Sequence, residues 1–457
     1  MPCPRLLRRF FVLFPLAACG SPRPGPADLP SLAGRAQVLW GRALAATVRS
    51  HAADAAALPD GGLVVAGDFA GTLIAANASA SARGGDGFVA WLDGGGAVRR
   101  LLSLGGAGQD RATAVAVASD GRAAVAGQVG GPVRLGKTEI GRTGATTGFV
   151  GVVSADGQWR WALALESNDP AYVADLAFTE AGMLVAGGFF TGSVSVGGVR
   201  LTSAGNQDAL IAAFDAGGKV AWARRAGGKG ADHGRGVAAA GGRIYLTGAF
   251  ARTADFAGAQ LDSNHNQDGF LAALTPAGKV EWVNTFGGTE RDIGMAVAAH
   301  ADRVAVGCVS SSHDADFGTG KLDAGEGLGA FVAEYSTEGE PRWAVRVGDG
   351  AAEARALTMT PDALMVGGTF TGVQKMGNTR VQAAGQRDLF VAAIDATGKV
   401  TAATALGGGK FDDLAALATV DGGAVLIAGT YAGSLRAGGD DLPEAKDSAA
   451  FAARLRP

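Results

Sequence analysis

A repeat of about sixty residues is the feature that most restricts how this chain can fold. The phrase LVVAGDFAG, residues 63–71, returns as MLVAGGFFTG at residues 183–192 and as LMVGGTFTG at residues 364–372. The first glycine after its apolar run falls at Gly67, Gly127, Gly187, Gly248, Gly307, Gly367 and Gly429. A second phrase, of the type DGFVAWLD, is centred at Phe88, Phe149, Leu210, Phe270, Phe331, Phe390 and Phe451. Both landmarks give the same seven units, which indicates an array of equivalent modules.

Each unit contains four short apolar runs with turn residues between them. In the second unit they read TAVAVAS, RAAVAGQV, GFVGVV and WRWALAL, and the first and last pairs are joined by DG and ADGQ. No apolar stripe with a helical period runs for ten residues, and 74 glycines among the 457 residues favour many tight turns. Four strands in about sixty residues, repeated seven times, predict an all-β, seven-bladed β-propeller of four-stranded blades.

The composition of individual strands supports this arrangement. The first run of each unit is rich in small residues, as expected where blades converge on an axis. The fourth run carries a tryptophan in five units, where the blades diverge and the gaps are widest. These positions are Trp40, Trp161, Trp222, Trp282 and Trp343, with Arg100 and Ala402 in the other two.

The two ends of the repeat region complement each other. The last unit ends with AFAARLRP after its third strand, whereas QVLWGRAL around Trp40 precedes the first unit and matches a fourth strand. We expect the strand around Trp40 to pair with the strand around Phe451 and to complete the last blade. This pairing closes the ring and removes two exposed sheet edges.

The full pattern is a GG-x3-D turn, an alternating run, the phrase VxVxGxFxG, a loop, and DxFVAxLDxxGxVxW. It resembles the bacterial seven-bladed β-propeller repeat, or SBBP, family over residues 38–457. Single units are degenerate, and the specificity comes from seven units in register. The resemblance implies an exported or surface protein, and it implies no shared catalytic activity.

The N-terminus has the features of a secretion signal. Arg5, Arg8 and Arg9 precede the apolar run FFVLFPLAA, which is too short to span a bilayer as a helix. The run ends in LAAC, residues 16–19, which resembles the lipobox of bacterial lipoprotein signal peptides. We therefore expect a signal peptide at residues 1–18, a lipidated Cys19 with a proline-rich tether to residue 35, and the propeller at residues 36–457. The alternative is an ordinary secretory peptide in which Cys19 is incidental.

Processing at this site determines the expected location and the cysteine content of the mature chain. Gly20 and Ser21 follow the cysteine, and a serine in the second place suggests export to the outer membrane, on its periplasmic or its surface side. Loss of three arginines changes the net charge from −3 to −3 − 3 = −6. Because Cys308 is then the sole unmodified cysteine, no intramolecular disulfide can form, and we expect its side chain to be a small buried hydrophobe.

Two sets of repeated aspartates are the main candidates for chemistry. The first set follows the GG signal by four residues and comprises Asp110, Asp232, Asp292 and Asp412, with Glu353 assigned to the same place in another unit. The second set opens the third strand and comprises Asp86, Asp208, Asp268 and Asp388, with Thr147 and either Leu328 or Gly329 elsewhere. They could bind a cation, a sugar or basic groups, but repetition in most units favours backbone hydrogen bonds within turns.

The remaining motifs point to no catalytic, cofactor or metal residue. DADFGTGKLDAGE, residues 314–326, begins like a calcium loop but departs from it at Gly318 and Thr319. The five histidines (His51, His233, His265, His300 and His313) show no metal-ligand spacing, and we expect them in solvated loops. No GxSxG motif occurs, and the glycine-rich turns precede strands, which makes phosphate binding at a helix improbable.

These observations predict a lipid-anchored, monomeric propeller that acts as a non-enzymatic binding or scaffold module of the bacterial envelope. The negative net charge and the absence of basic clusters argue against nucleic acid. The loops between second and third strands are long and differ in charge between units, so we expect an envelope protein or a glycan to bind on their face. The alternatives are a propeller enzyme, such as a quinoprotein or a polysaccharide lyase, and an accessory lipoprotein of outer-membrane assembly.

Overall fold

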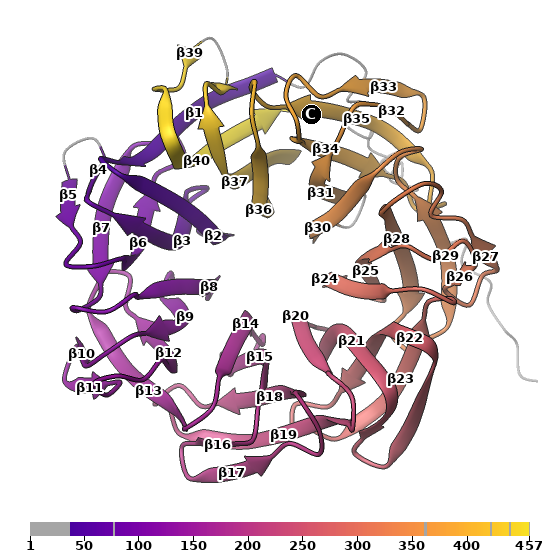
Figure 1. Ribbon diagram of the computed structural model, residues 1–457, viewed down its shortest axis with the longest axis horizontal. Coiled ribbons are helices and arrows are strands. Elements are labelled where there is room, and N and C mark those ends of the chain that lie inside the picture. The colour runs from indigo at the N-terminus through magenta and orange to yellow at the C-terminus, as the bar shows by residue number, and fades with distance from the viewer. Residues whose placement is uncertain (1–36, 76–77, 361–362, 421–422, 438–439, 457) are drawn as a thin grey trace, which may run out of the picture.

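A computed structural model describes residues 37–456, apart from 76–77, 361–362, 421–422 and 438–439. For residues 264–265, 437 and 440 it describes the backbone alone. The chain is an all-β propeller in which antiparallel strands are arranged radially around a central axis (Figure 1). The described residues contain no α-helix, and therefore no helix that is long and apolar enough to cross a membrane. The expected signal peptide and Cys19 lie outside the described residues.

One strand order, from the axis outwards, repeats around the ring. We call each set of four strands a blade and name it after its innermost strand. The innermost strands are β2 (Arg49–Ala57), β8 (Arg111–Val117), β14 (Ala171–Phe178), β20 (His233–Ala240), β24 (Asp292–His300), β30 (Ala352–Met359) and β36 (Asp412–Val420). They pair respectively with β3 (Leu63–Ala70), β9 (Ala123–Val129), β15 (Leu184–Phe190), β21 (Arg243–Phe256), β25 (Arg303–Ser310), β31 (Leu364–Phe370) and β37 (Ala424–Gly433).

The outer halves of the blades follow the same order. The third strands are β6 (Asp86–Leu92), β12 (Thr147–Val153), β18 (Asp208–Phe214), β22 (Ala259–Leu274), β28 (Gly329–Ser336), β34 (Asp388–Ile394) and β40 (Ala445–Arg456). The outermost strands are β7 (Val98–Leu104), β13 (Trp159–Ser167), β19 (Val220–Gly228), β23 (Val280–Phe286), β29 (Pro341–Arg346), β35 (Val400–Leu406) and β1 (Gln37–Ala46). Every residue of β6, β12, β18 and β34 is buried. Neighbouring blades cover both faces of these strands, which explains their continuous apolar runs.

The ring closes as the sequence predicts. β1 is antiparallel to β40, with Ala43 opposite Phe451. Ser50, at the start of β2, is buried and joins the two strands, because its hydroxyl donates to the carbonyl of Leu44 at 2.6 Å and accepts the N–H of Ala450 at 3.0 Å. The first and last parts of the chain therefore form one sheet with β37 and β36.

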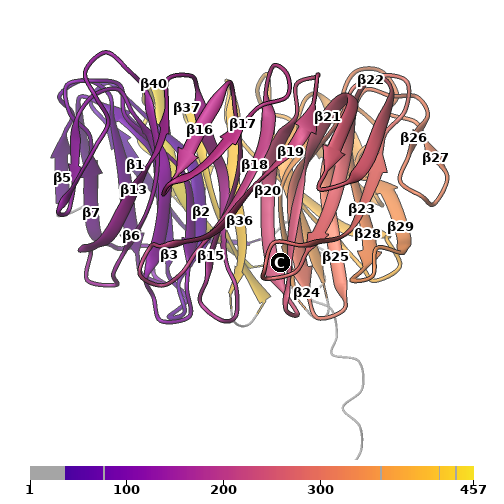
Figure 2. The same cartoon turned by 90° about the horizontal axis from the view of Figure 1, so that it is seen from below.

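The two ends of the ring differ in their connections. On one side, here called the turn face, short hairpins join first to second and third to fourth strands. Ser154–Gln158 is typical: Gly157 has a φ of 87° and its N–H bonds to Ser154, the geometry of a type I turn followed by a left-handed residue. On the opposite loop face, the expected long loops mostly form small hairpins (Figure 2).

These loop-face hairpins are β4–β5 (Thr72–Ala75, Ala78–Ser81), β10–β11 (Val133–Leu135, Thr138–Ile140), β16–β17 (Ser193–Val196, Val199–Thr202), β26–β27 (Ala315–Asp316, Lys321–Leu322), β32–β33 (Val373–Met376, Thr379–Gln382) and β38–β39 (Arg436–Ala437, Asp440–Asp441). Some of them extend the sheet of the preceding blade, since β4 pairs with β1 and β16 pairs with β13. In the β20 blade, the extended β21 pairs in the same way with β19. These pairings link neighbouring blades at the loop face.

The tryptophans of the outermost strands link neighbouring blades at the turn face. The indole N–H of Trp222, in β19, donates to the carbonyl of Pro276 in the turn of the next blade, at 2.8 Å. Its ring packs so closely on Gly278 of that turn that an added Cβ would lie 2.6 Å from Trp222 Cδ2. Trp40, Trp161, Trp282 and Trp343 lie equally close to Gly96, Gly218, Gly339 and Gly398.

The two exceptions to the tryptophan pattern have structural explanations. Arg100 takes the place of tryptophan against Gly157, and its guanidinium donates to the carbonyl of Ala155 at 2.5 Å. Ala402 faces the blade whose third and fourth strands are β40 and β1. Those strands come from opposite ends of the chain, so the turn on which a tryptophan would pack does not exist there.

Candidate functional site

The first aspartate set makes the same contacts in four blades. Each carboxylate is buried, and one oxygen accepts the N–H of the glycine four residues earlier at 2.7–2.8 Å. The pairs are Gly106 to Asp110, Gly228 to Asp232, Gly288 to Asp292 and Gly408 to Asp412. In three of them, the other oxygen accepts a backbone N–H from the end of the next strand, at Gly130, Ala251 or Ala432. These bonds join blades, which is the structural role that repetition favours.

The second set binds the chain just before the third strand. Asp208 accepts the N–H of Ala204 at 3.2 Å and the hydroxyl of Ser203 at 2.7 Å, and Asp388 accepts the N–H of Ala384 at 2.7 Å. Asp86 and Asp268 are buried at the same place. In the β24 blade, the sequence leaves open whether Leu328 or Gly329 takes the place of this aspartate. The strand register identifies Gly329, because Gly329 pairs with Ser310 in the same way as Asp388 pairs with Phe370.

Members of the two sets approach each other between blades. A Cβ added to Gly227 would lie 2.7 Å from Asp232 Oδ2 and 2.9 Å from Asp208 Cγ, so only glycine fits between the two carboxylates. Burial, with a contribution from the charge of Asp208, raises the pKa of Asp232 to about 6. Among the described residues, no group of three histidine, cysteine, aspartate or glutamate side chains could hold a metal ion.

The assignment of Glu353 to the first set is wrong. The residue four positions after Gly348, and therefore equivalent to Asp232, is Ala352. Since successive side chains in a strand point to opposite faces, Glu353 points away from the turn. Its carboxylate instead binds Arg355, with Oε2 lying 2.8 Å from Nε and 2.7 Å from Nη2.

The expectation that the histidines lie in loops is also wrong for most of them. His51, His233 and His300 lie in the innermost strands β2, β20 and β24. His233 is half-buried, and burial lowers its pKa to about 4. His313 is an exposed loop residue and pairs with Asp323, with Nδ1 and Oδ1 2.8 Å apart. The side chain of His265 lies outside the described residues.

The calcium-like segment forms capped turns, and Cys308 is buried as the sequence predicts. In residues 314–326, Asp316 accepts the N–H of Gly318 at 2.8 Å, and Asp314 accepts the N–H of Thr289 at 2.9 Å, so these carboxylates cap turns. The thiol of Cys308 is buried in β25, and burial raises its pKa well above the usual value. A thiol of this kind is unreactive.

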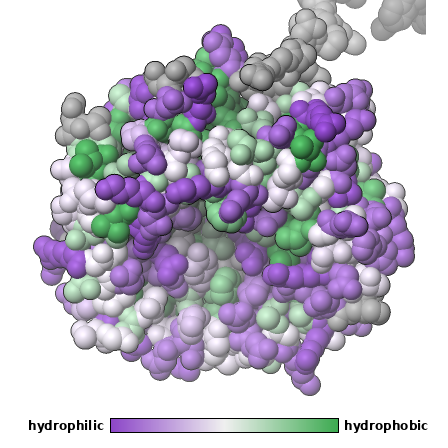
Figure 3. All heavy atoms as spheres, turned by 45° about the horizontal axis from the view of Figure 1, so that its top comes forward, coloured by the Kyte–Doolittle hydropathy of each residue, from purple (hydrophilic) through white to green (hydrophobic). Residues whose placement is uncertain are grey.

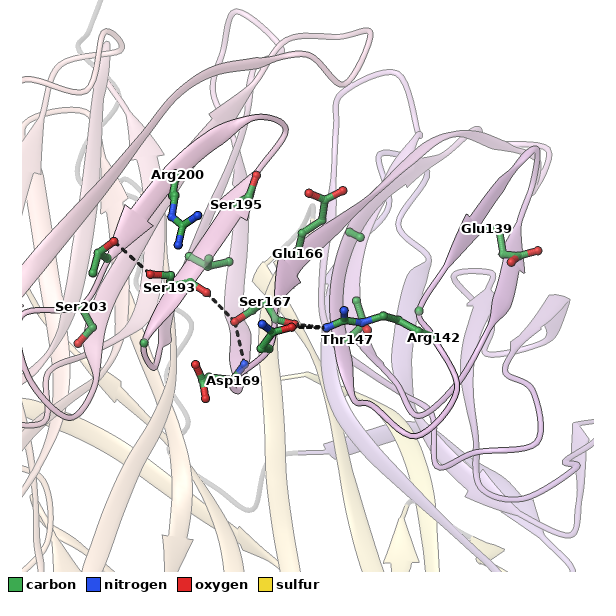
Figure 4. A pocket seen from close by; sticks show the side chains of 16 residues that line it. Glu139, Arg142, Thr147, Glu166, Ser167, Asp169, Ser193, Ser195, Arg200 and Ser203 are labelled. Carbon is green, nitrogen blue, oxygen red and sulfur yellow. Dashed lines mark hydrogen bonds between the residues drawn. The ribbon is translucent and has the colours of Figure 1, made fainter.

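The strongest candidate for a binding site is a groove on the loop face that the sequence did not single out. It has a volume of about 810 Å³ and lies between the hairpins β10–β11 and β16–β17, with β13 between them (Figure 4). Because β16 pairs with β13 whereas β10–β11 is a separate two-stranded sheet, a space remains between the two hairpins.

The groove is lined by hydroxyl groups and by charges of both signs. Arg142 is fixed on one side, because Nη2 donates to the carbonyl of Ser167 at 2.8 Å and to Asn168 Oδ1 at 2.9 Å. Glu166, Ser195 and Arg200 stand on the other strands and are visible in Figure 4. None of the described residues that line the groove is aromatic, so this lining offers hydrogen bonds and ion pairs and no surface on which a sugar ring could stack.

Comparisons with known proteins assign this chain to no family. No family model matches the chain, and no curated protein sequence matches it. Among solved structures, the β-propeller domain of the Trilobed protease from Pyrococcus furiosus is 10% identical, with a TM-score of 0.41 over 83% of this chain and 91% of that one. Sqt1 from Chaetomium thermophilum is 12% identical, with a TM-score of 0.40 over 85% and 97%. The Synechocystis apocarotenoid oxygenase is 11% identical, with a TM-score of 0.40 over 78% and 72%.

Proposed function

We propose that this chain is a lipid-anchored, seven-bladed propeller of the bacterial envelope that acts as a non-enzymatic binding module. The observation that carries the proposal is the groove between β10–β11 and β16–β17, where variable hairpins on a repeated scaffold make one asymmetric surface. Binding residues commonly lie on such variable connections held by a rigid framework.

The blade number is supported by the agreement between sequence and pairing. Each of the seven units of the repeat supplies an inner strand that pairs in the order first, second, third, fourth, with β1 as the fourth strand of the β36 blade. In three places the sheet of one blade is continuous with the sheet of the next. These continuities arise from pairing by β4, β16 and the loop-face part of β21, which belong to loop-face connections.

The anchor is proposed at Cys19, after cleavage of residues 1–18. A single acyl chain binds a membrane only marginally, at about 0.8 kcal/mol per buried CH₂, whereas two or more hold a protein stably. We expect Cys19→Ala to abolish incorporation of a palmitate analogue and to remove the protein from the outer-membrane fraction. Cys3→Ala is the matched control, because Cys3 would leave with the signal peptide. Absence of label on the wild-type chain would contradict the anchor.

The ligand that the groove fits best is a polar segment of another envelope protein. The hydroxyls and mixed charges of the groove can pair with the backbone groups and charged side chains of such a segment. The lack of an aromatic surface among the described lining residues disfavours a glycan. The negative charge expected of the mature chain, −6, does not favour a nucleic acid.

A loop exchange tests this binding site. Residues 191–207 and 371–387 have the same length, and their hairpins share one register, with Ser193 opposite Thr202 and Val373 opposite Gln382. Replacing the first segment by a copy of the second should therefore keep the fold and change the groove surface. We expect this exchange, and Arg200→Glu, to abolish recovery of the partner when the mature protein is used to capture envelope proteins.

The control reverses an exposed charge on the turn face by Lys219→Glu, which should leave capture of the same partner unchanged. Thermal unfolding of each variant shows whether the fold is intact. Capture of the partner by both groove variants would contradict the proposal. Loss of the partner in Lys219→Glu alone would show that the partner binds the turn face and not the loop face.

A further inference from the structure

A structural irregularity at the axis repeats in every innermost strand. Each strand has a β-bulge against its neighbour, and the bulged residue has no partner in the register. The bulged residues are Ala53, Thr113, Ala174, Arg235, Met295, Arg355 and Ala415. They line an axial cavity of about 380 Å³, and the space-filling view shows a hollow in the ring with hydrophilic residues around it (Figure 3). Two arginines thus face a space that the other blades line with small or apolar side chains.

The two arginines differ in their partners. Arg355 forms an ion pair with Glu353 at 2.7 Å and lies 4.0 Å from Asp413. At the position equivalent to Glu353, the β20 blade has His233. Because the pKa of His233 is low, its imidazole is neutral. Among the described residues, Arg235 has no hydrogen bond or ion pair, and its buried Nε has no acceptor. Arg235 is therefore a half-buried guanidinium without a counter-ion.

The two carboxylates of the cavity do not supply that counter-ion. Asp175 accepts the N–H groups of Leu176 and Val237 at 2.7 Å, and Asp54 makes equivalent bonds to Ala55 and Val115 at 2.8 Å. Each carboxylate thus links its own blade to the next innermost strand along the chain. Burial raises the pKa of Asp175 to about 7, so Asp175 does not carry a full negative charge near neutral pH, and burial also raises the pKa of Asp54 well above its usual value.

The surroundings of Arg235 add positive charge. Arg291 and Arg355 are near enough to lower its pKa further, after the larger effect of burial. Tyr172, at the loop-face end of β14, is another polar neighbour, and its ring stacks on Phe189 with centroids 5.3 Å apart. An unpaired buried cation among like charges is unfavourable unless a ligand compensates it.

We propose that the axial cavity binds a small oxyanion, of which phosphate is the simplest, with Arg235 as the principal contact. The planar guanidinium of Arg235 presents paired N–H donors that match the oxygens of phosphate or carboxylate. Arg355 lines the same cavity, with its charge paired to Glu353. An anion there satisfies the orphaned Nε and relieves the repulsion between the arginines. The anion is either free or carried by a larger ligand that extends beyond the cavity lining towards Tyr172, a neighbour of Arg235.

The test measures binding of inorganic phosphate to the full chain by calorimetry and by thermal unfolding, against sodium chloride of equal ionic strength. We expect phosphate to raise the unfolding temperature of the wild type. Arg235→Met copies the residue of the β24 blade, Met295, and should weaken phosphate binding at least about tenfold, because both charge and donors are lost. In phosphate-free buffer, Arg235→Met should unfold at a higher temperature than the wild type, since the uncompensated charge is gone.

Two further variants keep the result interpretable. Arg160→Met removes an exposed arginine of β13, away from the axis, and should bind phosphate as the wild type does. Arg235→Lys keeps the charge but not the paired donors and should bind with intermediate affinity. Phosphate without effect on the wild type, or unchanged phosphate binding by Arg235→Met, overturns the proposal.

A comparison of phosphate with phenyl phosphate distinguishes the two sources of the anion. Tighter binding of phenyl phosphate, lost in Tyr172→Ala, assigns the cavity to an anion carried by a larger ligand. Equal affinity for the two probes, unchanged in Tyr172→Ala, assigns it to a free anion. Both outcomes require Arg235.

Discussion

Deleting residues 36–44 is expected to open the ring and to destabilise the β36 blade more than any other. β1 pairs with β40 from Gln37 opposite Arg456 to Leu44 opposite Ala450, and Leu44 is fully buried. Each backbone hydrogen bond contributes about 0.5–1.5 kcal/mol net, and each large buried side chain about 1.5–3 kcal/mol. The deletion should therefore lower the free energy of unfolding by roughly 5–10 kcal/mol, a sum of these terms, which is comparable to the stability of a typical domain.

Hydrogen exchange resolved by segment measures this effect. Amides of β40 and β37 should lose protection, whereas those of β14 and β15, on another part of the ring, should keep most of theirs. A synthetic peptide of residues 36–46, added in excess, should restore protection because it can re-form the missing strand. A peptide of the same composition in scrambled order is the control. Unchanged protection in β40 after the deletion would show that closure does not stabilise the ring.

Replacing Trp222 by alanine is expected to lower the free energy of unfolding by about 3–5 kcal/mol, the usual cost of removing a large buried aromatic side chain. The indole is 7% exposed and donates to the carbonyl of Pro276 in the next blade, so the loss falls on the contact between two blades. Chemical denaturation measures it. A loss below about 1 kcal/mol, the usual effect of a surface substitution, would contradict a structural role for this contact.

Gly278 allows the contact itself to be isolated. Gly278→Ala should cost about 1–2 kcal/mol for its φ of 77° and about 1–3 kcal/mol more for the clash with Trp222. Gly242 has a similar φ of 74° and nothing within 4 Å of an added Cβ, so Gly242→Ala measures the backbone cost alone. In the Trp222→Ala background, Gly278→Ala should cost no more than Gly242→Ala. Additive losses in the double variant would contradict direct packing.

The candidate sites show where reasoning from sequence fails. The hydroxyls and charges of the groove come from residues, such as Glu166 and Arg200, that belong to no sequence motif. They converge only because β16 pairs with β13, whereas the hairpin β10–β11 forms a separate sheet. Arg235 and Arg355 do have a signal in the sequence, since both occupy one position of an otherwise small or apolar strand. The sequence does not show that Glu353 neutralises one of them and that the other lacks a partner.

The sequence by itself determined the architecture, because the signals for it are local. Alternating apolar runs, turn glycines and a sixty-residue period each depend on neighbouring residues, and they predict short strands in repeated units. The missing fourth strand after Phe451, together with the strand-like segment around Trp40, predicted the closure that β1 and β40 form.

Only the tertiary structure decided which side chains meet. Alternation along a strand means that one residue of offset sends a side chain to the opposite face, so Glu353 lies with Arg355 and not with the aspartates that join the blades. The bulge in every innermost strand turns Arg235 towards the axis, and pairing between blades sets the width of each groove. These contacts join residues from different units, and a pattern that repeats in every unit carries no information about them.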